Sequence, residues 1–144
     1  MLYLDRTGRG LFFVCLLMAL GSAGRGEGLQ LQLRLEHPST LQYEPIVAFL
    51  TIVNDTAKPF VISEAGQQSA ATLEFVVRKD TGETIGRRSE ALVAEKVYIP
   101  SDQKEELMIE VTDFYDLREV GRYLVSARVT WDGKTSWSEQ RMID

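Results

Sequence analysis

Cysteine and histidine are nearly absent from this sequence, which contains one of each, Cys15 and His37. Cysteine nucleophiles and stabilising disulfides need cysteines in the folded part of a chain, and Cys15 lies in an apolar run near the N-terminus. A Ser–His–Asp site would depend on His37, which directly precedes Pro38 where a predicted strand ends. We therefore interpret His37 as a solvated loop residue.

Sequence motifs of common catalytic and phosphate-binding sites are also missing. The chain has no Gly-x-Ser-x-Gly, no glycine-rich phosphate loop and no basic patch interleaved with aromatic residues. A net charge of −5 argues against nucleic acid and anionic membranes as partners. We expect no enzymatic activity and no cofactor. A small extracytoplasmic hydrolase is the remaining enzymatic alternative, and it would need carboxylates that converge in a pocket.

The N-terminal residues have the three parts of a secretory signal peptide. Arg6 and Arg9 precede an uninterrupted apolar run, residues 11–20, and the small residues 21–23 follow it. The run is too short for a stable transmembrane anchor. We predict cleavage after Ala23, a secreted or periplasmic protein, and no stable membrane span once the signal is removed.

Two alternatives for this segment are a buried first helix and a lipoprotein anchored at Cys15. The run has no polar face, and Val14 stands where a lipobox requires a small residue. Cleavage would remove Asp5, Arg6 and Arg9 and change the net charge from −5 to −6. The mature chain would contain no cysteine, so its core alone would hold it together.

After a flexible lead over residues 24–28, short segments of alternating apolar and polar residues are separated by turn residues. This pattern predicts strands over 29–35, 46–53, 60–62, 73–78, 84–87, 97–99, 107–111 and 123–130, and a last strand from the Asp132-Gly133 turn to Ile143. Residues 89–94 are expected to form one helical turn. The fold class is all-β: we expect these nine segments to form an Ig-like antiparallel β-sandwich of roughly seven to eight short strands in one domain, residues 29–144.

A polar, aromatic-bearing corner joins the strands over 107–111 and 123–130. Its predicted structural residues are Tyr115, Asp116, Gly121 and Tyr123. In Ig-like sandwiches a tyrosine at this place bonds through its hydroxyl to backbone upstream, and we assign that role to Tyr123.

The corner also contains Asp113, Asp116 and Glu119, each three residues from the next. Hard cations prefer several carboxylate oxygens, so a calcium site is the alternative to ordinary turn capping. We favour capping and expect no metal.

The order of turn and corner residues resembles a family of exported bacterial Ig-like modules. It comprises Glu44-Pro45, Asn54, Pro59, Asp80-x-Gly82, Pro100, Tyr115-Asp116-Leu117 and Gly121-x-Tyr123. The most similar modules are the non-catalytic β-sandwiches that precede the peptidase domain in deuterolysin-like zinc metallopeptidases. BsuPI-type proteinase inhibitors resemble the chain more distantly. The resemblance covers roughly residues 29–143 and implies the fold. Two departures are Pro100-Ser101-Asp102 in place of Pro-Gly-Glu and the absence of His-Glu-x-x-His, so the peptidase activity is not implied.

The expected function is that of an exported, non-enzymatic binding module, with another exported protein as the expected class of partner. A proteinase inhibitor is the alternative, and its protruding loop would be residues 64–71 or 89–95. In the second strand Ile46, Ala48, Leu50 and Ile52 share a face, which the resemblance implies to be the core face, so the outward residues include the apolar Val47, Phe49 and Val53. We expect these three either to lie beneath a loop or to form an interaction patch.

Three further features have two readings each. Asn54-Asp55-Thr56 matches a glycosylation acceptor, which we expect to be silent in a bacterial protein. Trp131 and Trp137 flank the last hairpin and form either a platform for sugar or protein contacts or, for Trp131, part of the core. The last strand has two registers, one with Trp137, Glu139, Arg141 and Ile143 inward, the other with Ser138, Gln140 and Met142 inward.

Overall fold

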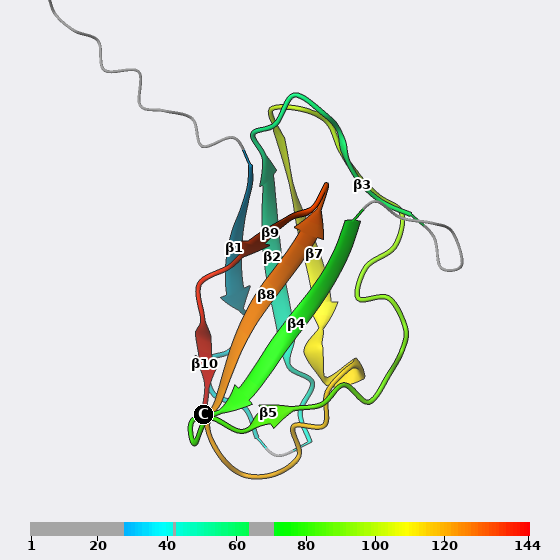
Figure 1. The fold of residues 1–144 in the computed structure, drawn as a ribbon. Coiled ribbons are helices and arrows are strands. Elements are labelled where there is room, and N and C mark those ends of the chain that lie inside the picture. Colours follow the sequence, from blue (N-terminus) through cyan, green and yellow to red (C-terminus); the bar gives the residue numbers. More distant parts are fainter. Residues whose placement is uncertain (1–27, 42, 64–70) are drawn as a thin grey trace, which may run out of the picture.

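Two antiparallel sheets packed face to face form the domain (Figure 1). The computed structural model describes residues 28–41, 43–63 and 71–144, so the predicted signal peptide lies outside the described residues. The described strands are β1 (Leu29–Leu35), β2 (Val47–Asn54), β3 (Phe60–Ile62), β4 (Ala71–Lys79), β5 (Thr84–Ile85), β6 (Val97–Ile99), β7 (Gln103–Glu110), β8 (Tyr123–Trp131), β9 (Lys134–Trp137) and β10 (Arg141–Ile143). A short 3-10 helix, η1 (Val111–Asp113), follows β7.

The strand order is that of an Ig-like sandwich. One sheet has the order β1-β2-β7 and the other the order β10-β8-β4-β5, with β9 also paired to β8. Strands β3 and β6 pair with each other in a separate two-stranded antiparallel sheet. The first sheet corresponds to A-B-E and the second to G-F-C with an added strand next to C. The predicted all-β sandwich is confirmed.

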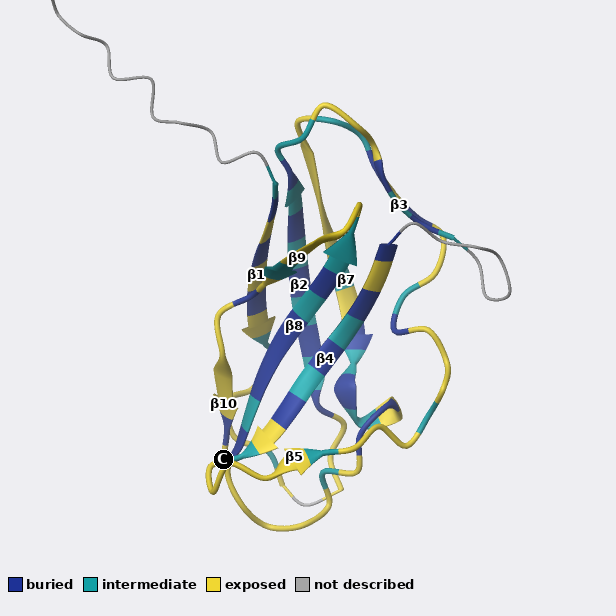
Figure 2. Cartoon of the chain, in the orientation of Figure 1, coloured by how far each residue is buried: buried dark blue, intermediate teal, exposed yellow. Residues whose placement is uncertain are grey.

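Alternating burial explains why these segments pair as they do. In β2 every second residue is buried, and Leu50 and Ile52 are fully buried against Leu33 and Leu31 of β1. In the other sheet Phe75, Val77, Val125 and Val129 supply the facing layer, and Figure 2 shows the alternation along each long strand. A sheet with one solvated face produces this period of two.

The last predicted strand is divided in two, which raises the described strands to ten, above the expected number. Ser138 and Ile143 are both buried, but they are five residues apart and cannot share a face of one regular strand. Neither predicted register therefore holds throughout. At the break, the Ser138 amide donates to the Ala127 carbonyl at 2.9 Å, and the Ala127 amide donates to the Ser138 hydroxyl at 2.8 Å. The serine side chain thus replaces one backbone partner of β8.

Residues 89–94 form bends without a helical turn, so that expectation was wrong. Val93 is buried and fixes the middle of this segment to the core, while Leu92 beside it is exposed. The Arg87 guanidinium donates to the Ala91 carbonyl, and the Ala91 amide donates to the Ser89 hydroxyl at 3.2 Å. Side-chain anchoring replaces helical hydrogen bonds here.

The edges of both sheets have features that discourage pairing with another chain. The Tyr115 hydroxyl donates to the Phe75 carbonyl of β4, and Arg141 Nε donates to the Leu33 carbonyl of β1 at 2.7 Å. Strand β7 exposes Lys104 and the two glutamates that follow it. Occupied edge carbonyls and charged edge residues reduce aggregation through exposed strands.

Candidate functional site

The predicted patch lies on the outer face of the β1-β2-β7 sheet, where Val47, Phe49 and Val53 are each half-buried. Arg34 and Met108 are the register neighbours of Phe49 on its two sides. The Arg34 guanidinium lies over the Phe49 ring at 4.1 Å from its centroid, and Met108 is 73% exposed. Side chains of neighbouring strands, rather than a loop, therefore provide this cover for Phe49.

The apolar area on this face is interrupted by polar groups. Thr51 separates Phe49 from Val53 on β2, and its hydroxyl donates to Glu106 at 3.5 Å. Glu106 also forms a long ion pair with Arg34, at 4.0 Å. A continuous apolar surface is the usual mark of a protein interface, and here it is limited to Phe49, Met108 and Val47.

We expect Phe49→Lys to lower the free energy of unfolding by about 1 to 2 kcal/mol, between the values for a buried and a fully exposed ring. The substitution removes a half-buried ring and places a second cation directly opposite Arg34. Thr51→Lys, two residues along on the same face, is the matched control, and it should change stability by less than about 0.5 kcal/mol. Urea denaturation measures both. A loss above about 3 kcal/mol for Phe49→Lys would instead place the ring in the core.

The corner between β7 and β8 is fixed by two buried tyrosines. The Tyr123 hydroxyl donates to the Glu119 carbonyl at 2.7 Å, four residues upstream, which is the bond expected of a tyrosine corner. Tyr115 makes the bond to Phe75 described above, and burial raises the pKa of both phenols. At Gly121 neither a left-handed backbone nor a close neighbour requires glycine. The tyrosines, and not that glycine, define the corner.

The three carboxylates of the corner do not converge. Asp116 is held by Arg118, whose Nε donates to it at 2.7 Å, and this pair lowers the pKa of Asp116 to about 2. Glu119 binds Lys79 at 2.6 Å instead. Across the described ranges, no three acidic, histidine or cysteine side chains are grouped as metal ligands. Two of the three corner carboxylates, Asp116 and Glu119, thus form ion pairs with basic side chains.

For Tyr123→Phe we expect a loss of about 1 kcal/mol, because one hydrogen bond disappears and the Glu119 carbonyl loses its partner. Tyr98→Phe is the control, since Tyr98 is 59% exposed. Thermal and urea unfolding should leave the control unchanged. Equal stability of the Tyr123 variant and the parent would show that the corner bond contributes nothing in solution.

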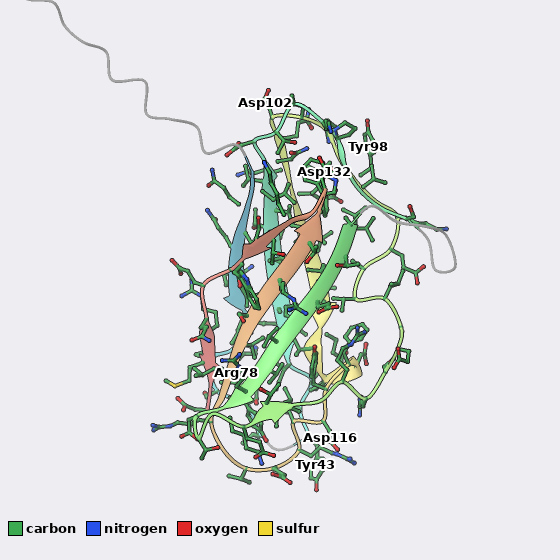
Figure 3. The ribbon with its side chains drawn as sticks, viewed as in Figure 1. Tyr43, Arg78, Tyr98, Asp102, Asp116 and Asp132 are labelled. Carbon is green, nitrogen blue, oxygen red and sulfur yellow. The ribbon has the colours of Figure 1, made fainter. Side chains whose placement is uncertain are left out.

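A cavity of about 720 Å³ opens at the other end of the sandwich. We call the three turns that form it, residues 54–58, 100–102 and 131–136, the loop end. Figure 3 places Asp102 and Asp132 at this end and Tyr43 and Asp116 at the opposite one. The lining residues are Gly28, Leu29, Asp55, Thr56, Ala57, Lys58, Ser101, Asp102, Trp131, Asp132, Lys134, Thr135 and Ser136. In Ig-like variable domains, loops at one end of the sandwich also form the binding surface.

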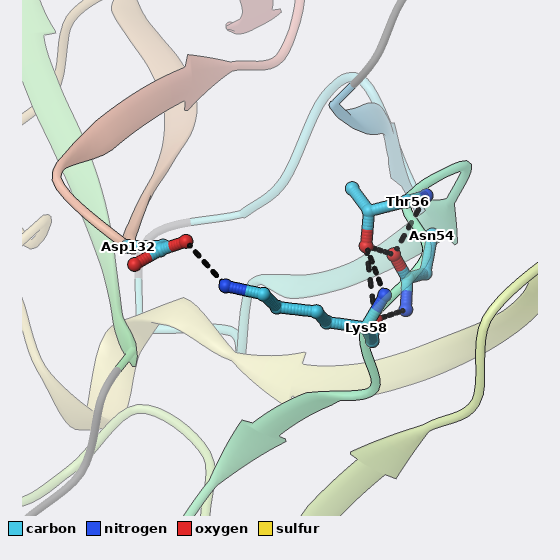
Figure 4. A network of polar contacts seen from close by, with 4 residues as sticks. All are labelled: Asn54, Thr56, Lys58 and Asp132. Carbon is cyan, nitrogen blue, oxygen red and sulfur yellow. Dashed lines mark hydrogen bonds and ion pairs between the residues drawn. The ribbon is translucent and has the colours of Figure 1, made fainter.

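A buried asparagine holds two of these turns together, and Figure 4 shows its contacts within the first turn. Asn54 is fully buried, and its Nδ2 donates to the carbonyls of Lys58, Ile99 and Pro100 at 2.8, 3.0 and 3.1 Å. Its Oδ1 accepts from the amide and the hydroxyl of Thr56 at 3.1 and 2.6 Å. Because the whole amide is used internally, the Asn54-Asp55-Thr56 triplet is a turn anchor in the folded chain and not an accessible acceptor for a glycan.

The third turn is a two-residue hairpin between β8 and β9. Asp132 and Gly133 both have positive φ, 49° and 73°, as this hairpin type requires. Lys58 reaches from the first turn and binds Asp132 Oδ2 at 3.3 Å (Figure 4). The pair is exposed and contributes little stability, but it links two walls of the cavity.

The two tryptophans lie in different surroundings and do not form one platform. Trp131 lines the cavity, is half-buried, and meets Phe60 edge to face with centroids 6.0 Å apart and planes at 76°. Trp137 is 50% exposed, with Arg128 over its ring at 5.4 Å. Trp131 therefore packs on the core residue Phe60 and also lines the cavity.

His37 is exposed in the loop after β1, at the end opposite the cavity. Of the two loops expected in an inhibitor, residues 64–70 lie outside the described residues, and Ser89–Glu95 is fixed by Val93.

Among the described segments, no helix has the length and apolar character needed to cross a bilayer.

In comparisons with known proteins, no family model and no curated sequence matches this chain. The resemblance to peptidase-associated and inhibitor modules therefore stays a prediction.

Proposed function

We propose that this protein is a non-enzymatic binding module that holds its ligand at the loop end. The observation that supports this most strongly is the cavity of about 720 Å³ between three turns, two of them fixed by the fully buried Asn54. This size lies within the range of small-ligand sites. A rigid wall loses little conformational entropy when a ligand binds, which favours affinity.

The outer face of the β1-β2-β7 sheet is the weaker candidate for the same role. Phe49 is half-buried there beneath Arg34, and polar side chains divide the apolar area. A recess of about 520 Å³ borders this face, but the residues of the face that line it are polar: Gln32, Arg34, Thr51 and Glu106. The described part of the face also lacks the continuous apolar core typical of stable interfaces.

Screening the whole protein on glycan and peptide arrays, in parallel with two variants, tests the proposal. Lys134→Ala changes an exposed residue of the cavity lining, and Phe49→Lys changes the outer sheet face. We expect wild-type signals that Lys134→Ala reduces and Phe49→Lys leaves unchanged. Signals lost only with Phe49→Lys would move the binding surface to the sheet face and contradict the proposal.

We also propose that the protein is exported, on the basis of Arg6, Arg9 and the apolar run that follows them. Mass spectrometry of protein recovered outside the cytoplasm should give a chain that starts near Gly24. An intact Met1 on exported material would contradict removal of a signal peptide.

A further inference from the structure

We infer that the ligand of the loop end is an uncharged saccharide, stacked on Trp131 and hydrogen-bonded by polar groups of the surrounding turns. This inference rests on the proposed function, because it assigns a ligand class to the same cavity. Three observations support it: the position of the indole ring, the balance of charge, and the mixture of uncommitted donors and acceptors.

Trp131 provides the flat apolar surface. It occupies the last inward-facing position of β8, where the strand leaves the sandwich, so the core covers it only in part. Its edge-to-face contact with Phe60 fixes the orientation of the ring before any ligand arrives. A pyranose has one face of C–H groups that packs on such a ring, while its hydroxyls point outward to polar partners.

The charges of the lining nearly cancel. Lys58 is paired with Asp132, and Asp55 accepts a hydrogen bond from the Gln30 side chain. The lining contains three aspartates and two lysines, so it has no basic surplus that would attract a phosphate or an acidic polymer. It also lacks the larger acidic excess that would select a cationic ligand.

Two charged groups of the lining remain available. Within the described part of the chain, neither the Asp102 carboxylate nor the Lys134 ammonium has a hydrogen-bonding or ionic partner. Carboxylates only accept hydrogen bonds and ammonium groups only donate them. A sugar hydroxyl does both, so the hydroxyls of an oligosaccharide suit both groups. The Ser136 hydroxyl on β9 adds a group of either kind, while the Thr135 hydroxyl shares a hydrogen bond with the Thr130 hydroxyl at 3.3 Å.

The test uses the whole protein carrying Trp137→Phe, which leaves Trp131 as the single tryptophan. Its emission is followed during titration with neutral oligosaccharides of glucose, mannose, xylose and N-acetylglucosamine. A polygalacturonate fragment and a mixed hexapeptide library are the charged and peptide comparators. We expect saturable quenching by at least one neutral sugar, with binding about tenfold weaker for Lys134→Ala or Asp102→Gly, since each removes one charged hydrogen bond. Glycine suits position 102 because Asp102 has a φ of 57°.

The outcomes separate this inference from the proposed function. Quenching by peptides or by the acidic fragment, with no response to any neutral sugar, would overturn the saccharide assignment and leave the loop end as a binding site. No response to any probe, together with array signals that Lys134→Ala does not reduce, would overturn both. Trp131→Phe keeps a smaller aromatic ring on Phe60, and the inference requires it to retain weakened sugar binding.

Discussion

Replacing Asn54 with alanine is expected to lower the free energy of unfolding by about 3 kcal/mol or more. The reason is the number of groups that depend on one buried side chain. Three carbonyls lose their donor, and the Thr56 amide loses its acceptor. Water cannot easily replace these bonds, since Asn54 is fully buried. Urea denaturation followed by circular dichroism gives the change in stability.

Two further variants make this prediction specific. Asn54→Asp keeps the shape and the acceptors but presents a carboxylate to three carbonyls, so it should also be strongly destabilising. Gln140→Ala removes an exposed amide and should cost less than about 0.5 kcal/mol. A loss below about 1 kcal/mol for Asn54→Ala would mean that the turns hold their shape without the asparagine.

Phe60→Ala should be the most destabilising single change, with a loss of about 4 kcal/mol. Phe60 is fully buried on the short strand β3, and its ring meets the Trp131 ring edge to face. Deleting the ring leaves a cavity and also frees the indole that lines the loop end. Near-ultraviolet circular dichroism should therefore lose intensity in the tryptophan region in native buffer, before any denaturant is added.

Phe60→Leu serves as the control for size, because it refills most of the space and should cost about 1 to 2 kcal/mol. The order of the two losses follows from the volume removed. If alanine and leucine had equal effects, the space beneath β3 would be accessible to water and the ring would not belong to the core.

Local alternation made most of the fold predictable. Strand β1 was predicted with its observed bounds because Leu29, Leu31 and Leu33 alternate with polar residues and turn residues follow. The tyrosine corner was predictable for a similar reason, since its bond from Tyr123 to Glu119 spans four residues. Patterns of this kind are complete within a short stretch of sequence.

Features that depend on distant segments were not predictable in the same way. The break at Ser138 depends on its bonds to Ala127 of β8. The two predicted registers assumed that inward and outward residues alternate without a break along the last strand, so neither could include it. The loop end unites three turns that are separated by dozens of residues. Asn54 gave a local signal as a turn residue, but its contacts with Ile99 and Pro100 come only from the folded chain.

The contacts of Phe49 on the outer sheet face also depend on how the strands pair. The phase that the resemblance implied for β2 predicted that Phe49 points away from the core, and the structure places it there, half-buried. The sequence alone did not indicate that Arg34 would lie over the ring, because that contact depends on the register between β1 and β2.

Backbone amide shift mapping by NMR is the most direct test of the loop end as a binding site. The ¹⁵N-labelled protein is titrated with the strongest ligand from the arrays, and the shift changes are placed on the sandwich. We predict that the largest changes fall in residues 54–58, 100–102 and 131–136, together with the Trp131 indole N–H, while Phe49 and Met108 stay unchanged. Changes concentrated on β2 and β7, with the three turns unaffected, would contradict the account.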